Sequence, residues 1–236
     1  MIAHRGASGY APENTLAAFR KAAELGARFI ETDLHVTRDL HFVAIHDATL
    51  ERTTNGRGGV HEKTLAELRK LDAGSWFGSE FVGERIPTLD EIFEFSNETD
   101  VGFYLEMKTG PGLGVSHALV SALRRATDTN RLIVISFDSS ILESVLRQEP
   151  SLMTGFLFDR RPREAVEQAQ RLGVRQLLPR GDLVSHELVI RAHHADLQVV
   201  TWTVDAPADL RTVIAAGVDG VMSNYPDRLI AILKES

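Results

Sequence analysis

The chain has 236 residues, of which 43% are hydrophobic, which is enough to build the core of one large domain and too many for a disordered protein. Its net charge of −7 argues against a nucleic-acid partner, and no apolar run approaches the ~20 residues of a membrane span, so we expect no stable membrane insertion. The absence of cysteine excludes disulfides and thiolate metal sites.

The N-terminal stretch predicts a strand, a loop and a helix. A short apolar run from Met1 ends in His4-Arg5, and a helix is expected over residues 15–25. A histidine and an arginine at the end of a strand lie where α/β folds keep their sites, although such a pair alone is more often a surface dipeptide. Because the first strand begins at Met1, we expect no signal peptide and a cytoplasmic location.

The next strand-like run, residues 27–34, carries two carboxylates near its carboxyl end. Glu31 and Asp33 are two residues apart, so their side chains point to the same face of a strand. Converging carboxylates repel unless a shared proton or a divalent cation lies between them, and oxygen ligands without cysteine favour Mg²⁺ or Ca²⁺. The alternative is an edge strand with solvated acids.

Residues 42–47 form a third strand-like run, which ends in His46-Asp47. Between Asp33 and His46 there is no room for a crossover helix, which takes about a dozen residues. In a (β/α)8 barrel, which fits a chain of this length, residues 34–41 would then recross the barrel wall as extended chain. His46 would face Glu31 and Asp33 across the barrel mouth.

Residues 51–88 are the least strand-like stretch and predict a small cap-like insertion at the rim of the barrel. Turn residues dominate 52–59, a short helix is expected over residues 64–71, and residues 74–78 form a loop with exposed aromatic side chains. Thr88 is expected to cap the next helix.

The fourth strand, residues 101–108, places Glu106 and Lys108 on one face. A lone Glu-x-Lys is more often an ion pair at a strand end. Beside Glu31 and Asp33, however, we expect Glu106 to be a third metal ligand.

The second half of the chain alternates strands and helices regularly. Strands are expected over residues 132–137, 153–158, 176–179 and 199–204, with helices over residues 139–148, 162–172, 185–195 and 207–216. A further run, residues 220–226, gives one strand-like segment too many for an eight-stranded barrel. Either it is a short closing segment, or another assignment is wrong. The predicted fold is a TIM-type (β/α)8 barrel, a single domain over residues 1–236, with a small insertion after the third strand and no helix between strands two and three.

Four motifs stand at the ends of these strands, and together they resemble the glycerophosphodiester phosphodiesterase family over essentially the whole chain. They are His4-Arg5-Gly6 with Pro12-Glu13-Asn14-Thr15, Glu31-Thr32-Asp33, His46-Asp47, and Glu106-Met107-Lys108. The resemblance implies cleavage of glycerophosphodiesters, such as glycerophosphocholine and glycerophosphoethanolamine, into an alcohol and glycerol 3-phosphate. It also implies that the insertion contributes to substrate choice.

The site residues take roles that suit this reaction. Glu31, Asp33 and Glu106 would hold one divalent cation, Mg²⁺ or Ca²⁺, while Arg5 and Lys108 bind phosphate oxygens. His4 and His46 have the pKa range of a general acid and a general base, and the sequence does not say which is which. It also leaves open whether the nucleophile is water or the 2-hydroxyl of the substrate, which head group is preferred, and the oligomeric state.

A tryptophan such as Trp202 is more often a packing residue of the core or rim, but the resemblance implies that it faces the site as a substrate-binding residue. Two departures from the family pattern are Asp205, in place of asparagine, and Ser223-Asn224, in place of Thr-Asp. We expect both to lie away from the metal ligands and the histidines, and to affect only substrate detail.

Three other readings remain open. The same site could cleave lysophospholipids or sphingolipids, as lysophospholipase D and sphingomyelinase D enzymes do. Exposed aromatic side chains in residues 75–81 favour this reading, whereas the lack of an amphipathic membrane helix argues against it. An enolising metal-dependent barrel would leave both histidines and Arg5 unexplained. A barrel retained only for binding should have lost at least one of the motif residues, and all are present.

Overall fold

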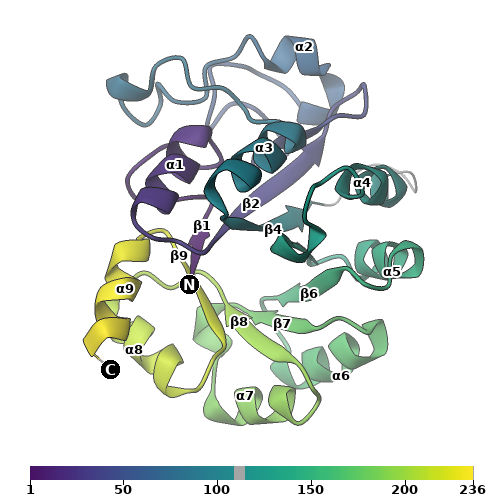
Figure 1. Cartoon of the computed structure of the whole chain (residues 1–236), viewed down its shortest axis with the longest axis vertical. Coiled ribbons are helices and arrows are strands. Elements are labelled where there is room, and N and C mark those ends of the chain that lie inside the picture. The colour runs from purple at the N-terminus through teal and green to yellow at the C-terminus, as the bar shows by residue number, and fades with distance from the viewer. Residues whose placement is uncertain (109–114, 236) are drawn as a thin grey trace.

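The computed structural model describes residues 1–108 and 115–235, and in these residues eight parallel strands close into a TIM-type barrel (Figure 1). The barrel closes because the first strand pairs with both the second and the last. The barrel strands are β1 (Ile2–His4), β2 (Phe29–Val36), β4 (Gly102–Met107), β5 (Leu132–Ser136), β6 (Met153–Phe158), β7 (Gln176–Pro179), β8 (Gln198–Thr201) and β9 (Gly220–Ser223). The predicted fold is confirmed.

Amphipathic helices surround the barrel and bury their apolar faces against it (Figure 1). They are α1 (Leu16–Glu24), α3 (Leu89–Thr99), α4 (Val115–Leu123), α5 (Ser139–Gln148), α6 (Pro162–Leu172), α7 (His186–His193), α8 (Pro207–Ala215) and α9 (Pro226–Glu235). Side-chain caps define several starts: Thr15 accepts from the backbone of Ala18, and Thr88 forms the predicted cap of α3 together with Glu91.

The extra strand-like segment is β3 (Phe42–Ala44), which does not belong to the barrel. It pairs antiparallel with the end of β2, with Leu34 opposite Ala44 and Val36 opposite Phe42. As predicted, no helix separates Asp33 from His46, but the prediction that residues 34–41 recross the barrel wall is wrong. A hairpin satisfies the backbone hydrogen bonds of this short segment at the rim, so β4 is the third barrel strand and β9 is the closing one.

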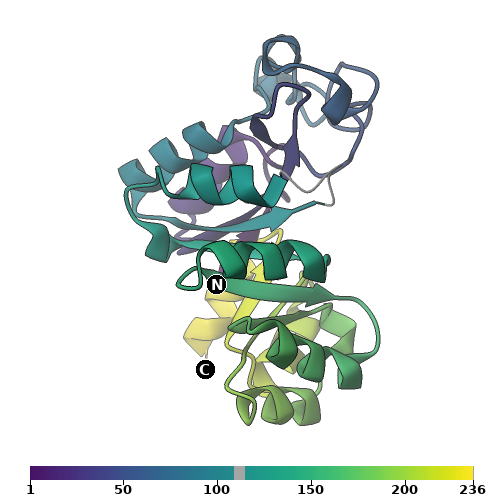
Figure 2. The same cartoon turned by 90° about the vertical axis from the view of Figure 1, so that its right-hand side faces the viewer.

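The insertion that follows β3 has a small apolar core of its own. It contains the short elements η1 (Val60–Glu62), α2 (Leu65–Leu68) and η2 (Ser79–Phe81), so the helix predicted over residues 64–71 is shorter than expected. This apolar core is formed by Ile45, Leu50, Val60, Leu68, Ala73 and Ile86, together with Val43 of β3. Figure 2 shows the insertion, in blue, standing out from one end of the molecule. Hydrogen bonds from Arg52 of the insertion to Glu13 connect it to the loop after β1.

The interior of the barrel is filled by a separate apolar cluster. Ile2, Tyr104, Ile133, Ile135, Leu157, Leu178, Val200 and Met222 form it. Because strand side chains alternate, the residues that point inward near the carboxyl ends of the strands form the floor of the barrel mouth. Among the described residues, none of the helices is long and apolar enough to cross a membrane.

Candidate active site

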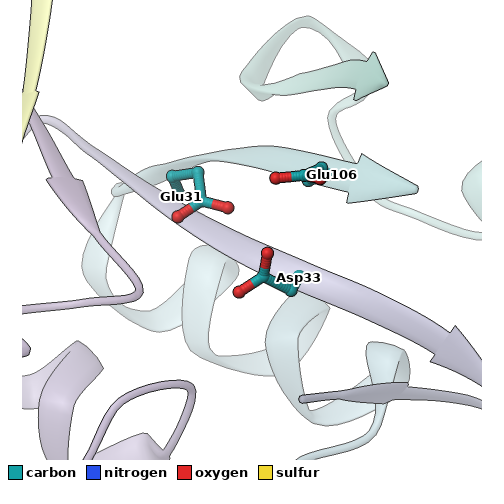
Figure 3. Close-up of side chains that lie close together, drawn as sticks. All are labelled: Glu31, Asp33 and Glu106. Carbon is teal, nitrogen blue, oxygen red and sulfur yellow. The ribbon is translucent and has the colours of Figure 1, made fainter. Parts of the chain in front are cut away.

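Three buried carboxylates converge at the mouth of the barrel, on β2 and β4. Asp33 lies directly opposite Glu106 in the parallel ladder, and Glu31 lies two residues earlier on the same face of β2. Their ligand oxygens lie within 4.8 Å of one another, and Figure 3 shows the three side chains pointing toward a common centre. The structure therefore brings together the three residues expected as metal ligands.

The three carboxylates, which are buried close together, have strongly shifted pKa values. Burial, and then the carboxylate of Asp33, raises the pKa of Glu31 well above its ordinary value and that of Glu106 to about 7. Burial would also raise the pKa of Asp33, but Lys108 and Arg5 hold it well below its ordinary value. Carboxylates this close together favour either shared protons or a bound cation.

The carboxylate cluster fits a hard divalent cation. Among residues 1–108 and 115–235, the buried Glu31 Oε1 finds no hydrogen-bond partner, so it can act as a ligand. The donor set is three carboxylates, which is the oxygen-rich chemistry that Mg²⁺ and Ca²⁺ prefer. We conclude that the residues present suit a divalent metal site.

Arg5 and Lys108 border the carboxylate cluster from the two sides of β2, since Arg5 directly follows β1 and Lys108 directly follows β4. Arg5 Nε lies 3.2 Å from Asp33 Oδ2, and its backbone N–H donates to Glu31 Oε2 at 2.9 Å. Lys108 Nζ lies 2.7 Å from Asp33 Oδ1 and also bonds Glu106. Two cations thus stand beside the centre, in position to bind an anionic ligand.

The loop after β1 is folded so that its backbone and one amide face the same carboxylates. Arg5 and Gly6 both have positive φ, and a Cβ on Gly6 would lie 2.7 Å from Ala18, so this close approach requires glycine. Asn14 donates to Asp33 Oδ2 at 2.8 Å, while its Oδ1 accepts from Thr32 and from the Asp33 N–H. Sequence analysis did not assign Asn14 a role, although it stands in the Pro-Glu-Asn-Thr motif.

His4 is oriented by hydrogen bonding across the point where the barrel closes. Its Nε2 lies 3.8 Å from Glu31 Oε2, and its Nδ1 bonds Asn224 Oδ1 at 2.8 Å. Burial, and then the charge of Arg5, lowers the pKa of His4 to about 4. The imidazole is therefore neutral near pH 7.

Asp205 and Asn224 lie directly behind His4, so the expectation that residues 205 and 223–224 are remote from the histidines is wrong. Asp205 accepts from the backbone and side-chain nitrogens of Asn224, at 2.8 and 2.6 Å, and from Ser223 Oγ at 2.8 Å. The Asn224 amide therefore turns its oxygen toward His4, whose Nδ1 must carry the proton. The physical reason is the pairing of Ala3 with Ser223, which brings the two chain ends together.

His46 reaches the mouth from the β2–β3 hairpin. The backbone N–H of Ile45 donates to the carbonyl of Asp33 at 3.0 Å, which places the following residue next to the carboxylate cluster. His46 Nδ1 bonds Asp47 Oδ1 at 2.7 Å, so this histidine has a carboxylate partner where His4 has an amide. The two imidazoles are thus held by different chemistry.

Trp202 lies at the carboxyl end of the barrel strands, in the other half of the mouth. Its Nε1 donates to the carbonyl of Leu178 at 2.9 Å, and its ring meets Phe137 edge-on at a centroid distance of 5.3 Å. Within the described residues, Trp202 therefore contacts Leu178 and Phe137 rather than the carboxylate cluster. Of the predicted site residues, Trp202 is the one that the structure does not join to the others.

Comparison with known proteins agrees with this arrangement. Residues 4–228 match the family model described as the glycerophosphoryl diester phosphodiesterase family. A glycerophosphodiester phosphodiesterase of Caldanaerobacter subterraneus subsp. tengcongensis is 41% identical, over 100% of this chain and 98% of the relative. One of Bacillus subtilis is 34% identical, over 96% of this chain and 83% of the relative.

Solved structures show the same similarity. A phosphodiesterase of Oleispira antarctica, in complex with the product sn-glycerol-3-phosphate, has a TM-score of 0.94 and 33% identity, covering 99% of this chain and 96% of that one. A protein of Silicibacter pomeroyi described as a putative glycerophosphoryl diester phosphodiesterase has a TM-score of 0.91 and 30% identity, covering 99% and 92%. The chain belongs to the glycerophosphoryl diester phosphodiesterase family.

Proposed function

We propose that this enzyme hydrolyses glycerophosphodiesters to an alcohol and glycerol 3-phosphate, with one divalent cation and the two histidines His4 and His46. The observation that carries the proposal is the set of two differently held imidazoles beside one buried carboxylate cluster. Support also comes from the Oleispira antarctica neighbour, which holds sn-glycerol-3-phosphate. Glycerophosphocholine and glycerophosphoethanolamine are the substrates to test first.

Charge neutralisation is the first requirement, because a phosphodiester repels nucleophiles. A cation held by Glu31, Asp33 and Glu106 would supply Lewis-acid stabilisation of charge on the phosphate. The Arg5 guanidinium can bind two phosphate oxygens with its planar fork, and the Lys108 ammonium adds a point charge. Both cations now bond carboxylates, so a bound phosphate would compete for them.

Proton transfer is the second requirement, and the hydrogen bonds favour different roles for the two histidines. His4 donates its Nδ1–H to a neutral amide, which leaves an Nε2 lone pair facing the site and suits a general base. His46 Nδ1 bonds the carboxylate of Asp47, which orients the ring for the role of a general acid. The acid protonates the leaving alkoxide as its bond to phosphorus breaks, and the base takes a proton from the nucleophile.

The decisive experiment measures release of glycerol 3-phosphate from a panel of glycerophosphodiesters, with EDTA and then with Mg²⁺ or Ca²⁺ restored. Release that EDTA abolishes and one cation restores would support the proposal and identify the metal. No release from the panel under any metal condition would overturn it. Phosphorus NMR during a single turnover distinguishes the nucleophiles, since attack by the substrate 2-hydroxyl gives a transient cyclic glycerol phosphate and attack by water does not.

A lipid phosphodiester is the second candidate substrate, because aromatic side chains cluster on the surface of the insertion. Trp76, Phe77 and Phe81 meet edge-on at centroid distances of 5.5 Å, and the adjacent Val82 is 66% exposed. Such a surface could contact an acyl chain. Faster turnover of lysophosphatidylcholine than of glycerophosphocholine would favour this candidate over the first.

A further inference from the structure

Arg52, in the insertion, joins two carboxylates that belong to different loops. Its guanidinium donates to Asp47 from Nε at 2.7 Å and from Nη2 at 3.0 Å. It also donates to Glu13 from Nη1 at 2.9 Å and from Nη2 at 2.7 Å. Both contacts are two-point contacts, so one planar group determines the orientation of two carboxylates.

Each of these carboxylates holds a residue of the proposed site. Asp47 Oδ1 bonds His46 Nδ1 at 2.7 Å, and Glu13 Oε1 accepts from Arg5 Nη1 at 2.9 Å. A continuous chain of hydrogen bonds and ion pairs therefore runs from an imidazole, through Arg52, to the guanidinium beside the carboxylate cluster. The insertion is connected through it to the loop after β1.

Stability alone does not explain this contact. The side chain of Arg52 is 43% exposed, so water weakens its ion pairs, and their bidentate geometry within a network leaves them a modest contribution to folding stability. Orientation is a different matter, since the bidentate geometry is specific to a guanidinium and lysine cannot reproduce it. Because this contact determines the position of two site residues, its loss should change the geometry of the site as well as the stability of the fold.

We propose that Arg52 is a positioning residue that sets His46 and Arg5 relative to each other without touching the substrate. The inference rests on the proposed function, because its first readout is turnover of a glycerophosphodiester. Asp47 and Glu13 are the two arms through which Arg52 acts. The His46 arm affects turnover, and the Arg5 arm affects phosphate binding.

The test compares Arg52→Gln and Arg52→Lys with Arg57→Gln, a matched control. Arg57 lies in the same insertion and is exposed, so its replacement makes the same change in charge. We expect kcat/KM to fall about 10- to 100-fold in both Arg52 variants, because small misplacements of reacting groups cost about this much. The control should retain wild-type kcat/KM, and all three variants should bind metal like the wild type. A wild-type kcat/KM in Arg52→Gln, or an equal loss in the control, would overturn the inference.

Chemical rescue separates positioning from a folding defect. In Arg52→Ala, added guanidinium chloride can enter the half-exposed space, and it should restore part of kcat, whereas sodium or ammonium chloride should not. No restoration in a variant that still binds metal would count against positioning by the guanidinium group. Double-mutant cycles measure the Asp47 and Glu13 contacts separately. Asp47→Asn should lower kcat, Glu13→Gln should raise KM, and adding Arg52→Gln to either variant should have little further effect.

Failure of the proposed function would look different from failure of this inference. If the wild-type protein releases no glycerol 3-phosphate, the proposed function is refuted. The inference about Arg52 can then still be tested by a measurement that needs no substrate. Nitrogen NMR of the imidazoles should then show that Arg52→Gln shifts the His46 signals and leaves those of His4 in place. Unchanged His46 signals would overturn the inference independently of activity.

Discussion

The two halves of the barrel share one strand register but place opposite kinds of side chain in the mouth. In a single row across the sheet, Asp33 pairs with Glu106, Glu106 pairs with Ile135, and Ile135 pairs with Gly155. The row therefore changes from charged to uncharged residues between β4 and β5. Beyond that point, in the apolar half formed by β5 to β8, Leu178 packs so closely that a Cβ on Gly155 would lie 2.3 Å from it.

The difference explains how a chain with one uniform fold can concentrate its chemistry. The charged half, formed by β1, β2, β4 and the loops after them, contains the buried carboxylates, and burial, followed by the charge of Asp33, raises the pKa of Glu31 and Glu106. The apolar half supplies a wall of low polarity beside them, and charge interactions are stronger in such surroundings. Residues of the charged half should therefore control activity and metal binding, and residues of the apolar half should control stability.

The largest expected effect is that of Glu31→Ala. We expect loss of the metal and a fall in turnover of roughly 10⁴-fold, because Lewis-acid stabilisation is worth several kcal/mol. Metal content by mass spectrometry and turnover measure the two losses, with Glu24→Ala, an exposed position on α1, as the control. Full metal occupancy in Glu31→Ala would remove this residue from the ligand set.

His46→Ala should have the next largest effect. General acid–base groups contribute about 10²–10⁴ in rate, so we expect a loss of that size with metal content unchanged. An activated p-nitrophenyl leaving group needs little protonation, so it should recover much of the lost rate if His46 is the acid. His117→Ala replaces an exposed histidine and serves as the control. Activity near that of the wild type in His46→Ala would refute the pairing of His46 with His4.

Local patterns in the sequence predicted the charged half well. Glu31, Asp33 and Glu106 could be placed on one side because side chains alternate along a strand, and alternation needs no knowledge of distant contacts. The direction of β3 could not be predicted, because an antiparallel hairpin and a recrossing strand have the same alternation. Chain length between two motifs excludes a helix but does not choose between these two paths.

Contacts that form only when the barrel closes could not be predicted from the sequence either. Asn224 and His4 stand at opposite ends of the chain, and their hydrogen bond follows from the pairing of β1 with β9. The excess of strand-like segments left β9 without a definite place. Nothing in the sequence indicates that residue 205 lies near the histidines, whereas the structure connects its carboxylate to His4 through Asn224.

Variants behind His4 should have a moderate effect. Asn224→Leu removes the acceptor of the Nδ1 proton, and Asp205→Asn loosens the amide that provides it. We expect kcat to fall about 10- to 100-fold, the usual cost of removing a group that orients a site residue. Nitrogen NMR should show a mixture of His4 tautomers in both variants. One unchanged tautomer together with a lowered kcat would mean that the two residues act by another route.

Metal affinity should depend on pH in the range that the pKa of Glu106 sets. Burial and Asp33 raise that pKa to about 7, so below pH 7 a proton occupies the carboxylate and competes with the cation. Affinity should fall as the pH drops below 7, and metal binding should release protons from Glu106 and from Glu31, whose pKa is raised as well. Calorimetry in buffers of different ionisation enthalpy measures these protons. Glu106→Gln should lower the number of protons released, and Glu98→Gln, at an exposed position on α3, should not.

The smallest effect on chemistry should come from the apolar half. Leu178→Ala empties a fully buried, closely packed position, so we expect unfolding to become easier by about 2–5 kcal/mol. Ile135 and Gly155 lie between Leu178 and the carboxylate cluster. The folded Leu178→Ala protein should therefore keep the wild-type kcat and metal affinity. Urea unfolding gives the stability, and turnover well below the transition gives the chemistry. A large loss of kcat in Leu178→Ala would mean that the apolar half positions the site as well as supporting it, and the division of labour between the halves would be wrong.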